Sequence, residues 1–343
     1  MREVLPGGRN RRSVVAVDVR AAGGRSIRPT GDWDGATFAH EGFAFTTDDE
    51  LLQRVLPFVA EGFSRDEPVL VVAGERVRTL LAEELGFDLR RLATFAPAET
   101  WWRGGHGTLH AYDRDLRALH ASAPSWRLAA EPVWLGHDDG REWSRFEAVA
   151  NLCYAQMPYY SLCLHDRQRL DEPVLDAVAR SHPLTWNGAA PVPGKAYQDP
   201  RGFLRAVQPS WQPRPGHAVA GIVTSAAEAR AELAGAVAGP WAPRVDDVVL
   251  ATHELVVNGL RVAPFAEVAY WTDGETLVVE VVDGGPGLPD DTLGYVPPAD
   301  DVLSGRGMWL AWCLADDAAI GSPPDGTAIR LFFGTGPSRR PQV

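Results

Sequence analysis

Four groups of residues in the C-terminal part of the sequence have the types and spacing to build a nucleotide site. Glu254 and Asn258 are four residues apart in a segment with helical apolar spacing, so both side chains lie on one helix face. The other groups are DGGPG at 283–287, GRG at 305–307, and GT at 326–327. Glycine permits positive φ and lets a ligand approach the backbone closely. Each group alone is weak evidence, but all four in this order indicate a nucleotide pocket.

The elements that must position these residues are readable from the apolar periodicity. Two helices are expected, at 225–239 and 244–263, and a hairpin follows at 267–285 that turns at Asp273-Gly274. A helix at 305–315 and a last hairpin at 318–333 complete the region. This order predicts a two-layer α/β sandwich, with one layer of mixed sheet and one layer of helices.

Residues 218–335 resemble the GHKL ATP-binding fold, which histidine kinases, gyrase-type ATPases and anti-sigma factor serine kinases share. The segments that carry the resemblance are HELVVN, VVDGGPG and GRGMWLAWCLADD, and they are most similar to the anti-sigma group. The resemblance implies that this domain binds ATP and Mg²⁺.

The resemblance also implies a role for each matching residue. Glu254 would be the general base that orients or deprotonates the attacking hydroxyl, and Asn258 would supply an amide oxygen to Mg²⁺. Asp283 would accept a hydrogen bond from the adenine amino group, which selects ATP over GTP. The other residues would surround the nucleotide: Gly285 and Gly287 at the base and ribose, Gly305, Arg306 and Gly307 at the phosphates, and Thr327 beneath the adenine. The segment Leu288–Ser304 would be a lid.

Two features depart from the family pattern. Gly259 follows Asn258 where the family usually has Ala or Ser, and glycine in a helix interior costs up to about 1 kcal/mol. Val262-Ala263 stands where a small polar or basic pair is usual. Neither change removes a catalytic atom, but both bear on phosphotransfer more than on ATP binding.

Residues 37–186 alternate five times between strand and helix patterns, which predicts a doubly wound, mostly parallel sheet. A helix over 48–63 is expected to be capped by Asp48 or Asp49. The start of this region is similar to a RecA-like ATPase, but ERVRTLL stands where a phosphate-binding Gly-rich loop with lysine would be needed. We therefore expect a sensor or docking domain without ATPase activity.

The same region resembles the MEDS sensory domain through FAHEGFAFTT, RFEAVANLCY, LCLHD and ARSHP. Seven residues match recurrent positions of that family and could line a small-molecule pocket at the carboxyl ends of the strands: His40, Glu131, Glu147, Asn151, Cys163, Asp166 and His182. Taken alone, each of them is more often a core or capping residue. A metal site of Cys163, His165 and Asp166 is disfavoured because side chains alternate along a strand.

Composition narrows the class of protein. The net charge of −12 and the lack of a basic stripe argue against direct nucleic-acid binding. No apolar run is long enough to span a membrane, and the three cysteines cannot all form disulfides within the chain. We therefore expect a cytoplasmic protein. The expected parts are a flexible leader at 1–36, a sensor domain at 37–186, a Pro- and Gly-rich linker at 187–217, an ATP-binding domain at 218–335 and a tail at 336–343.

The resemblances together imply an anti-sigma regulator that binds a sigma factor and phosphorylates a serine or threonine of a STAS-type antagonist, with a homodimer fitting the family. A sensor histidine kinase is the second hypothesis. It ranks lower because 225–239 contains no histidine and His217 lies in Pro-rich sequence. A binding module that holds nucleotide without catalysis is the third.

Overall fold

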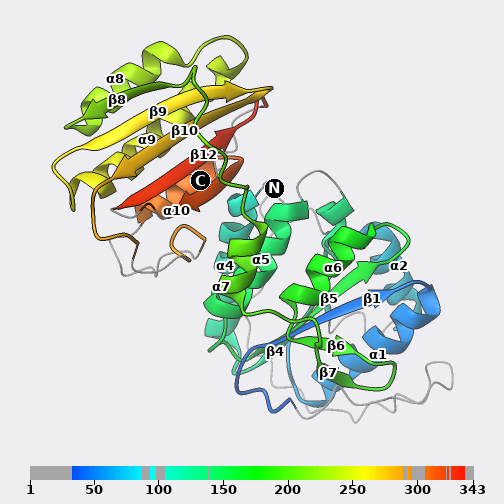
Figure 1. Ribbon diagram of the computed structural model, residues 1–343. Helices are drawn as coiled ribbons and strands as arrows, with labels where there is room; N and C mark the ends of the chain where they lie inside the picture. Colours follow the sequence, from blue (N-terminus) through cyan, green and yellow to red (C-terminus); the bar gives the residue numbers. More distant parts are fainter. Residues whose placement is uncertain are drawn as a thin grey trace.

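The computed structural model describes residues 33–85, 93–97, 105–136, 140–288, 292–295, 306–321, 323 and 326–336. They form two α/β domains, each built on its own sheet (Figure 1). The expected leader and tail lie almost entirely outside the described residues. No helix in the described ranges is long and apolar enough to cross a bilayer.

Sheet A, in the N-terminal domain, has seven strands in the order β3-β2-β4-β5-β1-β6-β7. The strands are β1 (Ala39–Phe45), β2 (Val69–Ala73), β3 (Ala93–Pro97), β4 (Trp126–Ala130), β5 (Tyr159–Asp166), β6 (Leu184–Trp186) and β7 (Pro191–Pro193). Every neighbouring pair is parallel except β6 and β7. The doubly wound, mostly parallel sheet is therefore confirmed.

Helices cover both faces of sheet A (Figure 1). One face packs against α1 (Asp48–Ser64) and α2 (Glu75–Glu84), and the other against α4 (Gly105–Ser122), α5 (Gly140–Cys153) and α6 (Glu172–Ser181). Side chains alternate along β5, so Tyr160, Leu162 and Leu164 join the α1–α2 core. The side chains between them, beginning with Ser161 and Cys163, face the α4–α5 side.

The cap of α1 differs from the prediction. Thr47, not Asp48 or Asp49, is the N-cap: its hydroxyl accepts from the Glu50 backbone N–H, and the Glu50 carboxylate accepts from the Thr47 N–H. This capping box satisfies two helix-end donors reciprocally, which a single aspartate cannot do. Asp48 and Asp49 instead lie in the first turn, where their charge favours the helix dipole.

Sheet B, in the C-terminal domain, has the order β11-β12-β10-β9-β8. Its strands are β8 (Val219–Val223), β9 (Ala266–Asp273), β10 (Thr276–Asp283), β11 (Asp317–Gly321) and β12 (Thr327–Phe333). All described pairs are antiparallel, so the expected mixed sheet is wrong. Strand β8 was not foreseen; its side chains are mostly exposed, and its pairing with β9 depends on contacts far along the chain.

One layer of helices covers one face of sheet B (Figure 1). It contains α8 (Ala226–Ala236), α9 (Val245–Leu260) and α10 (Arg306–Leu314), with a short 3₁₀ helix, η4 (Gly239–Arg244), before α9. The two-layer α/β sandwich of the C-terminal domain is thus confirmed.

The segment 187–217, expected to be a linker, joins the domains but is largely folded. It carries β7 and α7 (Pro200–Val207), and α7 packs on α5. Its last part lies against the second face of sheet B: Arg214 bonds to Glu267 and Glu280 at 2.5–3.0 Å, and the Trp211 ring stacks 3.9 Å from the Arg330 guanidinium. Several charge-assisted bonds therefore hold this segment on the C-terminal domain.

Candidate functional site

The first candidate site lies where α9, the end of β10 and the start of α10 meet. Helix α9 is fixed by buried apolar side chains such as Leu255 and Val256, and it presents Glu254 and Asn258 as half-buried groups. A Cβ placed on Gly307 would overlap the Glu254 carboxylate. Glycine at 307 thus lets the first turn of α10 approach Glu254 directly.

Asp283 ends β10 and forms the centre of the glycine-rich turn. One carboxylate oxygen accepts from the Gly285 N–H at 2.8 Å, and the side chain is half-buried. A Cβ on Gly259 would lie 3.0 Å from the Asp283 Cβ. The glycine at 259, where the family usually has Ala or Ser, therefore has a structural reason. Because Gly259 has no side chain, α9 can pack closely on Asp283.

The other glycines surround the same aspartate. A Cβ on Gly326 would overlap the Asp283 carbonyl oxygen, and the φ of Gly326 is +129°, so this position requires glycine. Thr327 is buried on β12 directly opposite Asp283. Gly287 lies beside Gly326, because a Cβ added to Gly287 would be 3.8 Å from the Gly326 carbonyl oxygen.

The second departure from the family pattern, at Val262-Ala263, has a partial structural explanation in the contacts of Val262. Its Cγ2 would lie 2.5 Å from a Cβ on Gly285, and about half of its surface is exposed. An apolar side chain thus contacts the glycine turn where the family usually has a polar or basic one. Asn258, one turn earlier, has its side-chain oxygen 3.4 Å from the Arg261 guanidinium.

Most of the predicted nucleotide residues converge in this way. Arg306 begins α10 and is exposed, while Gly305 lies outside the described residues. So does most of the expected lid Leu288–Ser304. In its described part, the Tyr295 ring packs on Trp312 at 5.8 Å, edge to face.

These residues fit a nucleotide. Cβ atoms at Gly285, Gly307 and Gly326 would overlap other atoms of the protein, so glycine at these positions lets the elements of the site pack closely together. The first turn of α10 offers backbone N–H groups to an anion. Glu254 and Asn258 supply oxygen atoms of the kind that Mg²⁺ prefers.

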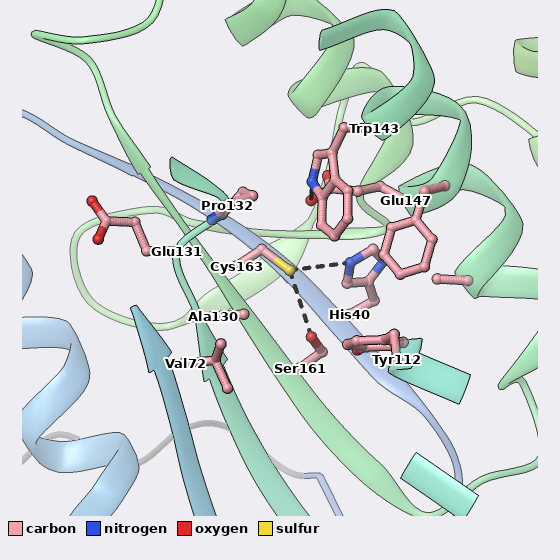
Figure 2. A pocket seen from close by; sticks show the side chains of 12 residues that line it. His40, Val72, Tyr112, Ala130, Glu131, Pro132, Trp143, Glu147, Ser161 and Cys163 are labelled. Atoms are coloured by element: carbon pink, nitrogen blue, oxygen red, sulfur yellow. Dashed lines mark hydrogen bonds between the residues drawn. The ribbon is translucent and has the colours of Figure 1, made fainter. Parts of the chain in front are cut away.

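The second candidate site is a buried polar cluster on the α5 side of sheet A. A cavity of about 20 Å³ is lined by His40, Tyr112, Trp143, Glu147 and Cys163 among others (Figure 2). The cavity has room for about one water molecule.

Strand register and one glycine bring the cluster together. His40 on β1 lies opposite Ser161 on β5, and Gly42 opposite Cys163. A Cβ on Gly42 would lie 2.8 Å from the ring of His182, the residue that ends α6. Glycine at 42 therefore leaves the space in which the His182 ring packs over β1.

The charges of the cluster are suppressed by burial. Burial raises the pKa of Glu147 to about 8 and lowers the pKa of His182 to about 4. Burial likewise lowers the pKa of His40 and of His165 well below the usual value. At neutral pH these four groups are thus predominantly uncharged.

The seven expected sensor residues divide between two places. His40, Glu147, Asn151, Cys163 and His182 form the buried cluster. Asp166 lies at the end of β5, where it pairs with Arg76 at 2.9 Å and lines a second cavity of about 180 Å³. Glu131 lines both cavities.

Glu131 also bonds to the start of α2, the position at which a phosphate would bind in a nucleotide-binding domain of this type. Its carboxylate accepts from the N–H of Gly74, the N-cap of α2, at 2.9 Å. An internal carboxylate therefore occupies this helix start.

Sequence reasoning missed His165 and Trp143 as members of the cluster. His165 is two residues after Cys163 on β5, and this period-2 spacing was the signal that places both on one face. Trp143 is four residues before Glu147 on α5 and donates to its carboxyl group at 2.7 Å.

Comparison with known families identifies both domains. Residues 39–183 match the MEDS family model, described as the MEthanogen/methylotroph, DcmR Sensory domain, and residues 219–333 match the histidine kinase-like ATPase domain. No curated protein matches the chain. The chain therefore joins an N-terminal MEDS sensor domain to a C-terminal histidine kinase-like ATPase domain, as in a GHKL-type regulatory protein.

Proposed function

We propose that the protein is an ATP-dependent anti-sigma regulator whose C-terminal domain phosphorylates a protein antagonist. The observation that carries this proposal is the close packing that glycines allow around Glu254 and Asp283, with Asn258 on the same helix as Glu254. Asp283 would hold the adenine, the first turn of α10 the phosphates, and Asn258 the Mg²⁺ ion. Bound Mg·ATP supplies the phosphoryl group and neutralises its charge.

Glu254 would act on the hydroxyl group that receives the phosphate. In the described part of the chain, no group donates a hydrogen bond to its carboxylate, so one oxygen is open to a serine or threonine O–H. As the new phosphorus–oxygen bond forms, the bond between the γ-phosphorus and ADP would break, ADP would leave, and the hydroxyl proton would pass to a Glu254 oxygen. Phosphorylation of the antagonist would then decide whether a sigma factor is held or released.

The structure favours this function over a histidine kinase. Among the described residues, the helix nearest before the ATPase domain is α7, which has eight residues and no histidine. His217 lies in irregular chain, with Nε2 3.2 Å from the Thr272 carbonyl oxygen. Within the described ranges, no helix directly before the ATPase domain carries a histidine that could accept the phosphate. Incubation with labelled ATP, alone and with STAS-type proteins, tests the three functions. Self-labelling on histidine indicates a histidine kinase, transfer to serine or threonine indicates the proposed function, and no transfer indicates a binding module.

Asn258→Ala tests the metal role in the proposed ATP site. We expect ATP binding to lose its dependence on Mg²⁺, because alanine offers no oxygen ligand. Calorimetric titration of the full chain with ATP, with and without Mg²⁺, measures this. His253→Ala on the same helix is the matched control and should retain the dependence. Equal Mg²⁺ dependence in Asn258→Ala and wild type would refute the ligand role.

Signals from the sensor domain have a direct route to the ATPase domain. Arg145, buried on α5, forms an ion pair with Asp317 at the start of β11 and donates to the Val207 carbonyl oxygen at 2.8 Å. The Ile320 N–H donates to the Gln208 side chain at 3.2 Å. Helix α5, which carries Glu147, thus contacts the edge strand of sheet B. We infer that changes at the sensor cluster reach the ATPase domain through α5.

A double-mutant cycle of Arg145→Ala and Asp317→Ala measures this contact. We expect a coupling free energy of about 1–3 kcal/mol in unfolding, because Arg145 is almost fully buried. The pair Arg180 and Asp176, with a partly exposed arginine and an exposed aspartate, is the control, with an expected coupling below about 0.5 kcal/mol. Equal coupling in the two cycles would contradict an interdomain contact of this strength.

A further inference from the structure

We propose that the buried cluster of the sensor domain is a transition-metal site, with Zn²⁺ or a similar ion held by His40, Cys163, His182 and Glu147. The first observation is proximity: the ligand atoms of His40, Cys163 and His182 all lie within 4.8 Å of one another, as do those of Glu147, His165 and His182. Thiolate, imidazole and carboxylate are the ligands of zinc sites.

Two of the atom pairs lie close to the spacing of a tetrahedral site. His40 Nε2 is 3.4 Å from Cys163 Sγ, and His182 Nε2 is 3.1 Å from the nearer Glu147 oxygen. Metal–ligand bonds of 2.0–2.3 Å in a tetrahedron separate neighbouring ligand atoms by roughly 3.3–3.7 Å. Metal entry would therefore require only small shifts within each pair.

The hydrogen bonds around His40 leave its Nε2 lone pair facing the cysteine. Asn151 donates through its amide nitrogen to the backbone carbonyls of Glu147 and Ser181 at 3.0 and 2.8 Å. Its oxygen must then face His40 Nδ1, 3.0 Å away, which assigns the ring proton to Nδ1. Nε2 is left as an unprotonated ligand atom beside Cys163.

His182 is arranged in the same way. Its Nδ1 lies 2.7 Å from the Val178 carbonyl oxygen, so Nδ1 carries the proton and Nε2 is free. Metal-ligating histidines in proteins characteristically donate their other ring N–H to a carbonyl or carboxylate, which fixes ring orientation. Both histidines have this second contact, on separate elements of the fold.

Unpartnered buried atoms are the independent observation. Both ring nitrogens of His165 make no hydrogen bond, although this side chain is almost fully buried, and His182 Nε2 faces only the Glu147 oxygen 3.1 Å away among the described residues, a contact of the protonated carboxyl group that a metal ion would replace. Buried polar atoms in native proteins are normally paired, so a group of unpaired ones calls for a ligand. A metal ion in the cluster would take the lone pair of His182 Nε2 and a Glu147 oxygen, and it would lie within reach of one nitrogen of His165.

Cobalt titration of the full chain, freed of metal by a chelator and carrying no histidine tag, tests the site. We expect one equivalent of Co²⁺ to bind with a thiolate-to-cobalt charge-transfer band and tetrahedral visible bands, and Zn²⁺ to displace it. Cys163→Ser should abolish the charge-transfer band, whereas Cys153→Ser, at the end of the same helix α5 as Glu147, should retain it. No saturable binding, or a band unchanged in Cys163→Ser, overturns the proposal.

Two further measurements do not depend on the folding of Cys163→Ser. Zn²⁺ should raise the unfolding midpoint of the wild-type chain, because an ion that binds only the folded state stabilises it. Asn151→Ala, which removes the partner of His40, should weaken Co²⁺ binding by about 10–100-fold. An unchanged midpoint with Zn²⁺ contradicts the site, and unchanged affinity in Asn151→Ala contradicts the assigned role of His40. Neither result bears on ATP binding.

Discussion

Replacing Glu254 by glutamine is expected to lower phosphoryl transfer to the antagonist by about 10²–10⁴-fold, the usual contribution of a general base. Glutamine keeps the shape of the side chain and one hydrogen-bonding oxygen, but it cannot take the hydroxyl proton. The glycines that approach Glu254 and Asp283 are untouched, so ATP affinity should change little. Transfer assays with labelled ATP, together with calorimetry on the same protein, separate the two effects.

The matched control is Glu275→Gln in the exposed turn between β9 and β10, which should transfer phosphate as wild type does. In cells, Glu254→Gln is expected to hold its partner constitutively, because the antagonist stays unphosphorylated. Equal transfer by Glu254→Gln and wild type would remove the base assignment. If wild type transfers no phosphate to any STAS-type protein while binding ATP, the chain is a nucleotide-gated binding module.

Asp283→Asn is expected to weaken ATP binding by about tenfold to a hundredfold. A hydrogen bond to a charged acceptor is worth roughly 1.5–3 kcal/mol, and the amide would present a donor to the adenine amino group. The substitution leaves the turn intact, because the asparagine oxygen can still accept from the Gly285 N–H. The variant thus separates a ligand-binding role from a role in the turn.

Calorimetric titration with ATP and with GTP measures this effect, since Asp283 is proposed to select adenine. Asp273→Asn, at the other end of the same hairpin, should leave ATP affinity unchanged. Wild-type affinity in Asp283→Asn would show that the aspartate only shapes the turn.

Much of the fold could be predicted because it depends on local periodicity. Period-2 strands and 3.6-period helices in the first half predicted the doubly wound sheet, and the turn at Gly274, whose φ is +59°, was readable from one dipeptide. The short, mostly exposed β8 and the helix α7 were missed. Their stability comes from pairing with β9 and packing on α5, not from their own sequences.

The sequence by itself determined which residues could form the nucleotide site, because four motifs in a set order lie on predictable elements. Only the tertiary structure showed why Gly259 is tolerated, since its contact with Asp283 joins a helix to a distant strand. The sensor residues show the same limit: sequence matched seven positions, but only strand register and the packing of α6 showed that Cys163 meets His40 and His182. Contacts between residues more than a hundred positions apart depend on sheet order and register, which local periodicity does not encode.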